Sequence, residues 1–276
     1  MVRRRLTAVF GWTRHSTYLL SAFLLTIFLI AYIWWPLAED ALAYFRGGQP
    51  WWVDLLYFDW LLVGIFLGMS LLIMAHADLR VDARSVLVGA VGGLVIESLG
   101  TQTNLWTYYT NERPPLWIIP AWPIASLAID RLERALQVVL RQIPLDVQAR
   151  LYRGLYWLVF GGFYALMLVF VAPTFDKSFT WMALALCALL TLTPTDHRMA
   201  VLTFAAGSGL GYFLELWGTT RQCWTYYTLQ TPPLFAVLAH GMAAVAFWRA
   251  GLVAESLLKR LQGSSLVARQ QMQGQG

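Results

Sequence analysis

Charged residues and cysteines are scarce in this sequence. Asp, Glu, Lys and Arg together make up 13% of the 276 residues, against roughly a quarter in an average soluble domain. The two cysteines, Cys187 and Cys223, form no CxxC pair and therefore predict neither a disulfide framework nor a zinc site. This composition argues against a soluble globular domain and against a disulfide-stabilised scaffold.

The short signatures of several enzyme classes are also absent. The chain contains no GxxxxGK[ST], GxGxxG, GxSxG or HExxH pattern, so nucleotide-binding loops, serine hydrolases and zinc peptidases find no support. Its four histidines and its carboxylates form no closely spaced ligand set. We therefore predict no metal site, and the chemistry inferred below requires no cofactor.

Long apolar runs dominate what is present. Hydrophobic residues make up 58% of the chain and aromatic residues 15%, and a helix needs about 20 apolar residues to cross a bilayer. Eight candidate runs occur, at 17–37, 55–76, 84–100, 115–132, 154–172, 178–195, 199–217 and 232–250. The sequence thus predicts an all-α integral membrane protein with about eight transmembrane helices.

The basic residues cluster at the ends of these runs. The net charge is +5, but no basic stripe or domain is present, so we expect no nucleic-acid partner. Arginines precede the first run, crowd the connection between the fourth and fifth runs, and follow the last run with Lys259. By the positive-inside rule, both termini are predicted to be cytoplasmic, in the inner (cytoplasmic) membrane. The sequence leaves an oligomer open.

One pentapeptide occurs twice, at a fixed offset. Trp106-Thr107-Tyr108-Tyr109-Thr110 recurs at Trp224-Thr225-Tyr226-Tyr227-Thr228, 118 residues later (224 − 106). The same offset pairs the motif G-x3-G-x3-E-x2-G in the third and seventh runs, the segment PPL before the fourth and eighth, and Arg131 with Arg249.

Each half then holds four helices, and an even number of crossings returns the chain to the same side. This predicts two tandem four-helix repeats in parallel orientation. The predicted regions are a basic cytoplasmic N-terminus (1–16), repeat one (17–132), a basic connection (133–153), repeat two (154–261) and a disordered tail (262–276).

Two glutamates lie within the repeated glycine motifs. Glu97 shares one helix face with Gly89 and Gly93, because positions i, i+4 and i+8 lie along one stripe, and Glu215 has the same place in the second half. Small residues at this spacing let helices approach closely in lipid, so both carboxyls are predicted to face the protein interior. Ionisable groups inside a membrane indicate function. The alternative is a structural carboxyl that hydrogen-bonds a neighbouring helix.

Aromatic residues crowd the loop that follows each glutamate. We predict that Trp106, Tyr108 and Tyr109 line a pocket together with Trp224, Tyr226 and Tyr227 in the second half. The competing interpretation is a belt of interfacial anchors, for which tryptophan and tyrosine are typical. The identical spacing from a glutamate in both halves favours the pocket.

One equivalent position differs between the halves. Trp122 in the fourth run corresponds to His240 in the eighth. His240 could pair with Glu215 or relay a proton, and a structural histidine with a hydrogen-bond partner is the alternative. We name Glu97, Glu215 and His240 as candidate catalytic residues and Trp122 as a candidate substrate contact.

The segments from Glu97 to Leu116 and from Glu215 to Leu234 resemble those of membrane carotenoid-processing proteins, the heterodimeric or fused lycopene cyclases, and more loosely those of carotenoid hydratases. The resemblance covers about half the chain and implies two related helical bundles, each with an acidic residue, an aromatic loop and a proline. The cyclases carry paired acidic residues after that proline, where this chain has Trp122-Pro123 and Ala239-His240.

Two classes of function follow from these residues. The first is an enzyme that protonates an isoprenoid or carotenoid-like lipid and so starts a cyclisation, hydration or isomerisation, with Glu97 and Glu215 as acids. The second is a non-catalytic transporter of a lipid or small molecule, or a subunit that assembles with other membrane proteins. For the enzyme and for the transporter, the predicted partner is a bilayer lipid or isoprenoid. For the assembly subunit, the predicted partners are other membrane proteins.

Overall fold

In the computed structural model, the described residues are 11–36, 39, 59–140 and 145–273. Their backbone forms eight α-helices, one short 3-10 helix and two three-residue strands. The helices are α2 (Arg14–Ile33), α5 (Trp60–Met74), α6 (Leu79–Gln102), α7 (Ala121–Val139), α8 (Leu145–Val171), α9 (Ser178–Leu192), α10 (His197–Thr220) and α11 (Leu234–Gln273). The other elements are η3 (Ala172–Thr174), β1 (Trp106–Tyr108) and β2 (Trp224–Tyr226). The all-α prediction is confirmed for these residues, and each predicted apolar run overlaps one helix.

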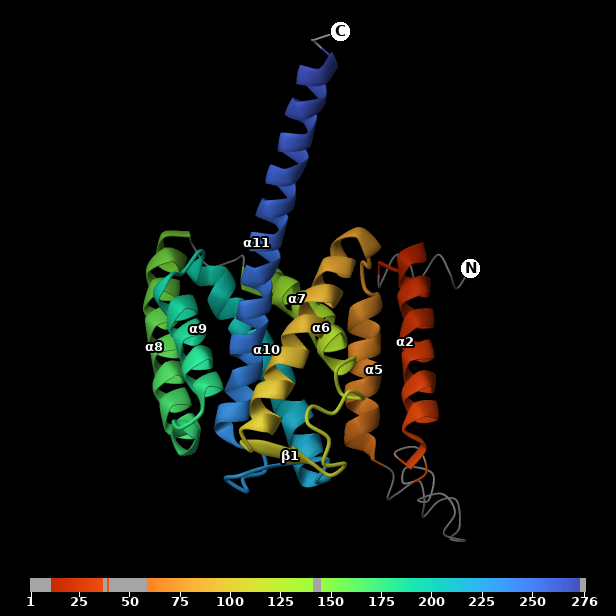
Figure 1. The fold of residues 1–276 in the computed structure, drawn as a ribbon, viewed down its shortest axis with the longest axis vertical. Coiled ribbons are helices and arrows are strands. Elements are labelled where there is room, and N and C mark those ends of the chain that lie inside the picture. The colour runs from red at the N-terminus through yellow and green to blue at the C-terminus, as the bar shows by residue number, and fades with distance from the viewer. Residues whose placement is uncertain (1–10, 37–38, 40–58, 141–144, 274–276) are drawn as a thin grey trace.

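The helices form one bundle with two distinct ends (Figure 1). Helices α6, α7, α10 and α11 lie in the centre, α2 and α5 flank them on one side, and α8 and α9 flank them on the other. The strands lie at one end, called here the strand end. The start of α2 and the C-terminal part of α11 lie at the opposite end, called here the termini end.

Four of the helices are long and apolar enough to cross a membrane. They are Arg14–Ile33, Ala149–Thr174, His197–Thr220 and Leu234–Arg260, and α5 and α9 are shorter apolar helices. Apolar side chains also face outward: Phe28 and Tyr32 on α2 and Leu192 on α9 are more than two thirds exposed. Outward-facing apolar surface of this extent is expected of a chain that lipid solvates. The helices are therefore those of a membrane protein.

Short polar side chains define where several helices begin. Asp78 and Asp196 are the N-caps of α6 and α10, and their carboxylates accept hydrogen bonds from the backbone N–H of Arg80 and Met199, both at 3.0 Å. Such caps satisfy backbone donors that the first helical turn leaves without partners. The two aspartates therefore fix where α6 and α10 begin.

Helix α7 differs from its prediction at both ends. It begins at Ala121, whereas the predicted run begins at residue 115, and residues 116–120 form turns instead. Pro120 and Pro123 explain the late start, because proline lacks the N–H that a helix interior requires and fits only its first turn. The helix then continues to Val139, and α8 begins at Leu145. Much of the predicted connection 133–153 is therefore helical.

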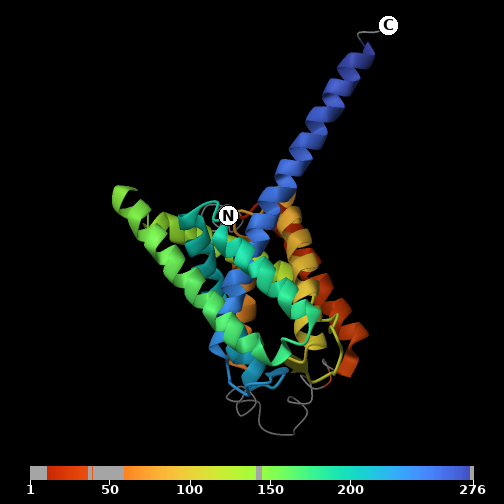
Figure 2. The same cartoon turned by 60° about the vertical axis from the view of Figure 1, so that its left-hand side comes forward.

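Helix α11 is longer than predicted. It continues through Gln273 and projects from the bundle at the termini end, as Figures 1 and 2 both show. Most of the segment 262–276, predicted as a disordered tail, is therefore helical in this structure. The basic residues of the predicted N-terminal segment up to Arg5, and most of the loop 38–54, lie outside the described residues.

Candidate functional site

The two copies of the repeated pentapeptide meet at the strand end. Strands β1 and β2 pair antiparallel, with Trp106 opposite Tyr226 and Tyr108 opposite Trp224. Two further backbone hydrogen bonds, from Tyr109 N to Cys223 O and from Tyr227 N to Leu105 O, extend the pairing at 3.1 Å each. Each half of the chain thus contributes one strand to a single two-stranded sheet, called here the floor of the site.

Glu97 accepts three side-chain hydrogen bonds beside this floor. Its Oε2 accepts from Trp106 Nε1 at 3.0 Å and from Tyr108 OH at 2.9 Å, and its Oε1 accepts from Trp122 Nε1 at 3.1 Å. The glutamate is 4% exposed. All three partners donate, so the arrangement suits a buried carboxylate whose lone pairs are satisfied.

Glu215 has an equivalent set of partners in the second half. We call each glutamate with its three hydrogen-bond partners a cradle. It is also 4% exposed, and it accepts from Trp224 Nε1 and Tyr226 OH, both at 2.9 Å. The third partner is His240, whose Nε2 lies 2.9 Å from Glu215 Oε1. Residues separated by 118 positions therefore make the same three contacts, except that an imidazole replaces an indole.

The repeated glycines explain how these rings fit. A methyl group on Gly100 would collide with the ring of Trp106, and one on Gly218 would collide with the ring of Trp224. Gly93 and Gly211 likewise leave room for Trp122 and His240 respectively. The motif G-x3-G-x3-E-x2-G thus places each glutamate and also clears the space for the two rings that bind it.

The phenols of the cradles remain protonated. Burial, together with the negative charge of the neighbouring glutamate, raises the pKa of Tyr108 and of Tyr226 well above the ordinary value. Each therefore remains a hydrogen-bond donor to its carboxylate throughout the physiological pH range.

The two unlike residues lie against each other. The rings of Trp122 and His240 stack with centroids 5.6 Å apart and an interplanar angle of 19°. This stack connects the two cradles, because each ring is hydrogen-bonded to the glutamate of its own half.

A cavity of about 340 Å³ lies beside both cradles. Its wall includes eight residues predicted for the site, namely Glu97, Trp106, Tyr108, Trp122, Glu215, Trp224, Tyr226 and His240. The rest of its wall is almost wholly apolar. Its size is within the range of small-molecule sites, about 300 to 1,000 Å³. We call it the strand-end cavity.

Two predicted substrate contacts lie elsewhere. Tyr109 and Tyr227 are more than 40% exposed and do not line the strand-end cavity. Side chains along an extended segment alternate between its faces, so the tyrosine that follows Tyr108 or Tyr226 points away from the cavity. Tyr227 instead donates to the backbone oxygen of Phe170 at 2.7 Å. The structure corrects the prediction for both residues.

Sequence reasoning missed the side wall of the cavity. Phe163 and Met167 of α8 and Met182 and Leu186 of α9 contribute to it. Four alanines of α11 also line it, and a signal for them was available. They are Ala236, Ala239, Ala243 and Ala246, spaced by three or four residues along one helix face.

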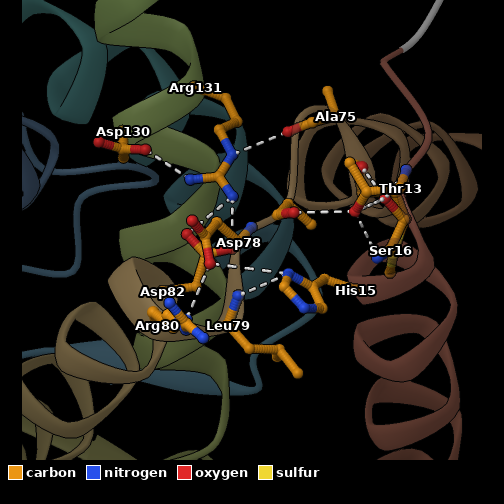
Figure 3. Close-up of polar contacts among 12 residues, drawn as sticks. Thr13, His15, Ser16, Ala75, Asp78, Leu79, Arg80, Asp82, Asp130 and Arg131 are labelled. Atoms are coloured by element: carbon orange, nitrogen blue, oxygen red, sulfur yellow. Dashed lines mark hydrogen bonds and ion pairs between the residues drawn. The ribbon is translucent and has the colours of Figure 1, made fainter. Parts of the chain in front are cut away.

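A second polar cluster lies at the termini end (Figure 3). Arg131 binds both carboxylate oxygens of Asp82, at 2.8 and 2.9 Å, and donates from Nε to Ala75 O at 3.1 Å. Nearby, Ser16 Oγ donates to Met74 O at 2.7 Å and holds α2 against α5. These contacts join helix ends and lie outside the strand-end cavity, so we assign them a structural role.

The described part of the chain offers no evident place for a metal ion. No three His, Cys, Asp or Glu side chains within it are grouped as ligands. His197 packs its ring on Tyr156, with centroids 4.9 Å apart. Asp59, the N-cap of α5, accepts from Trp217 Nε1 and Arg221 Nε at 2.8 and 2.9 Å, and so ties α5 to the end of α10.

The central helices border another cavity, of about 350 Å³, whose wall is formed by the parts of α6, α7, α10 and α11 that lie toward the termini end. Its wall carries several charged residues, unlike that of the strand-end cavity. We call it the termini-end cavity.

Comparisons of the chain with protein-family models, with curated proteins and with solved structures find no match.

Proposed function

We propose that this chain is an integral membrane enzyme that protonates an isoprenoid or carotenoid-like lipid in the strand-end cavity. Cyclisation, hydration or isomerisation of the substrate would follow, without a redox cofactor. The observation that carries the proposal is the contact of 2.9 Å between His240 Nε2 and Glu215 Oε1 at the wall of an apolar cavity.

The His240–Glu215 pair is suited to hold an exchangeable proton. An imidazole nitrogen can accept a proton and release it again, and Glu215 Oε1 lies within hydrogen-bond distance of it. Trp224 and Tyr226 also donate to Glu215, so the carboxylate is held in place while the imidazole takes up and releases a proton. Proton transfer by a positioned group contributes about 10² to 10⁴-fold to a rate.

The first step transfers this proton to one carbon of a substrate double bond. The π electrons form the new C–H bond, and the other carbon becomes a cation. An internal double bond can capture this cation and close a ring, after which a proton returns to the enzyme. Alternatively, water adds with loss of its proton, or a proton leaves from the adjacent carbon to give an isomer.

The Glu97 cradle has a different part in this proposal. Trp122 cannot titrate, so Glu97 has only fixed donors, and its carboxylate stabilises the substrate cation electrostatically. The faces of Trp106, Trp122 and Trp224 around the cavity add attraction for the cation, about 0.5 to 2 kcal/mol per ring. Candidate acid and candidate cation stabiliser are thus assigned to different halves.

We further propose that all eight helices lie in the membrane as two tandem four-helix repeats of parallel orientation. Four helices have the length and apolar composition for a span, and equal contacts at the 118-residue offset support the repeat. The positive-inside rule favours cytoplasmic termini, with the chain in the inner (cytoplasmic) membrane. The resemblance to lycopene cyclases and carotenoid hydratases agrees with the proposed substrate class.

The proposal is tested by single substitutions and lipid extraction. Cells that make the wild-type chain, Glu215→Gln, His240→Gln or Glu97→Gln are extracted, and their isoprenoids are compared by liquid chromatography and mass spectrometry. We expect the product to disappear in the first two variants and to fall in the third. Glu112→Gln is the control, because Glu112 lies outside the cavity and binds Trp34 and Thr110. An isoprenoid profile that is the same in all strains would refute the proposal.

A transporter of a lipid or small molecule, or an assembly subunit, is the second candidate. The observation in favour of transport is the termini-end cavity, which α6, α7, α10 and α11 enclose at the opposite end from the cradles. Flux of a labelled isoprenoid into proteoliposomes that depends on Glu215, with no chemical change in that isoprenoid, would favour this candidate over the enzyme.

A further inference from the structure

The termini-end cavity is lined by residues that the 118-residue offset pairs. Ser85 faces it together with Thr203, and Gln137 together with Glu255. The cavity is therefore built from equivalent positions of the two halves, as the strand-end cavity is. Its volume of about 350 Å³ is sufficient for a small organic ligand.

The two facing helices give this cavity one polar and one largely apolar wall. The α7 wall carries Asp130, Glu133, Arg134 and Gln137, and the equivalent α11 residues are Trp248, Gly251, Leu252 and Glu255. A ligand that fills the space must then present a polar group to one side and apolar surface to the other. The walls therefore select an amphipathic molecule.

Glu133 is the carboxylate on this wall that makes no ion pair in contact among the described residues, and the positive charges of Arg134 and Arg198 act on it only from a longer distance. Asp130 binds Arg134 at 3.0 Å, and Glu255 binds Arg84 at 2.9 Å. Glu133 is only 5% exposed, and its described hydrogen bond comes from the neutral amide of Gln137. Burying a carboxylate without an ion pair in contact is costly, and a bound cation would supply that contact.

The wall opposite Glu133 has both the space and the rings for a cation. The equivalent position is Gly251, where an added methyl group would meet nothing within 4 Å. Phe247 and Trp248 line the same wall, and the faces of aromatic rings attract ammonium groups. Carboxylate and aromatic rings together are the chemistry that recognises alkylated amines.

We infer that the termini-end cavity is a binding site for an amphipathic organic cation, an amine or quaternary ammonium with an apolar body. Glu133 neutralises its charge, and Phe247 and Trp248 contact its apolar part. The inference rests on this cavity alone and does not depend on the chemistry proposed for the strand-end cavity.

The test is equilibrium binding of radiolabelled benzyltrimethylammonium to the purified full chain in a non-ionic detergent. We expect saturable binding that unlabelled benzyltrimethylammonium displaces. Neopentylbenzene, the uncharged molecule of the same shape, should compete at least about tenfold less well, because it cannot replace the missing counter-ion.

Two variants locate the site. Glu133→Gln should weaken binding about tenfold or more, and Gly251→Leu should abolish it by filling the space. Glu112→Gln and Glu215→Gln, which lie outside this cavity, should bind as the wild-type chain does. Thermal unfolding of each variant identifies any loss of folding.

Three results would overturn the inference. The first is the absence of saturable binding to the wild-type chain, and the second is equal competition by neopentylbenzene. The third is unchanged affinity in folded Glu133→Gln and Gly251→Leu. The first two need no variant, so the inference stays testable even if a substitution prevents folding.

Discussion

The cradles around Glu97 and Glu215 differ at a single contact. Each glutamate accepts from a tryptophan nine residues later and a tyrosine eleven residues later, and the third partner is Trp122 in one and His240 in the other. An indole can only donate, whereas an imidazole can also accept and release a proton. The comparison teaches that one scaffold can fix two buried carboxylates while only one of them contacts a ring that can accept and release a proton.

The helices that flank the cradles differ more widely. In the first half, α5 packs against both α7 and α10 and forms part of the core with Ile73 and Met69. In the second half, α9 packs mainly against α8, and its residues Met182 and Leu186 line the strand-end cavity. Helix α5 thus fills space in the core, whereas α9 borders the strand-end cavity.

Exchanging the unlike residues should produce the largest effect. We expect His240→Trp to lower the yield of lipid product by about 10² to 10⁴-fold, because the second cradle would keep three donors but lose the imidazole that transfers the proton. The melting temperature should change little, since Gly211 clears space at this position as Gly93 does for Trp122. Product yield by mass spectrometry and thermal unfolding in detergent check both expectations.

The reverse exchange, Trp122→His, is the matched control. It leaves His240 and Glu215 unchanged, so product formation should persist. If His240→Trp retained full activity while folded, the assignment of the proton to the second cradle would be wrong.

The arginines Arg131 and Arg249, which the offset pairs, should differ in their effect on stability. Arg131→Met leaves the buried Asp82 without its partner, and breaking a buried ion pair costs about 3 to 5 kcal/mol. Arg249 donates instead to Leu190 O and Thr193 Oγ1, so Arg249→Met should cost about 1 to 2 kcal/mol.

Unfolding of the two variants in a denaturing detergent measures this difference. Equal free energies of unfolding would show that the Asp82 contact adds nothing. The double variant Arg131→Met, Asp82→Leu should recover part of the loss, because no buried charge then lacks a partner.

Substitution of the glycines that leave room for the indoles should lower the stability of the fold moderately. Gly100→Ala and Gly218→Ala force a methyl group against Trp106 and Trp224, and overpacking costs about 1 to 3 kcal/mol. Gly161→Ala and Gly162→Ala on α8 are the controls, because an added methyl group meets nothing within 4 Å there. Melting temperatures that fall equally in all four variants would argue that helix backbone effects dominate.

The substitution of Asp59 should change the free energy of unfolding least, and that change should depend on pH. Its burial raises the pKa of Asp59, but hydrogen bonds from Arg221, the N–H of Leu62 and Trp217 outweigh this and hold the pKa below its usual value. A lowered pKa means that the stabilisation is complete above the unfolded pKa, about 3.9, and is lost as the pH falls through the folded pKa.

Asp59→Asn should therefore cost about 0.5 to 1 kcal/mol at neutral pH, and the difference from wild type should shrink below about pH 4. Lys177, which the offset pairs with Asp59, makes an ion pair with the adjacent Asp176, so Lys177→Met is the comparison. Thermal unfolding from pH 7 to pH 3 gives both curves. A constant difference across this range would contradict the assigned ion pair with Arg221.

Much of the fold and of the cradles could be predicted from the sequence. Apolar runs predict the helices because a membrane span requires such runs. The duplicated spacing of glycine, glutamate and aromatic residues predicts ten site residues, and eight of these line the strand-end cavity. A repeat within one chain reports constraints that both halves share, and the cradle geometry is such a constraint.

The parts that could not be predicted depend on contacts between segments distant in sequence. Nothing local to Phe163 or Met182 indicates that α8 and α9 border the cavity, because that depends on how these helices pack. The late start of α7 came from Pro120 and Pro123 acting on one half only. The prediction for Tyr109 and Tyr227 is wrong because side chains along an extended segment alternate between its two faces, and the spacing from the glutamate does not show which face a tyrosine takes.

The most direct measurement of the central claim is mass spectrometry of lipids that copurify with the chain in mild detergent. We predict a prenyl or polyene chain bound to the wild-type chain and to Ala185→Trp, whose site lies outside the strand-end cavity, and its loss from Ala183→Trp, whose site lines it. Recovery of only bulk phospholipid, in equal amounts from all three proteins, would contradict the claim that this cavity holds an isoprenoid beside the His240–Glu215 pair.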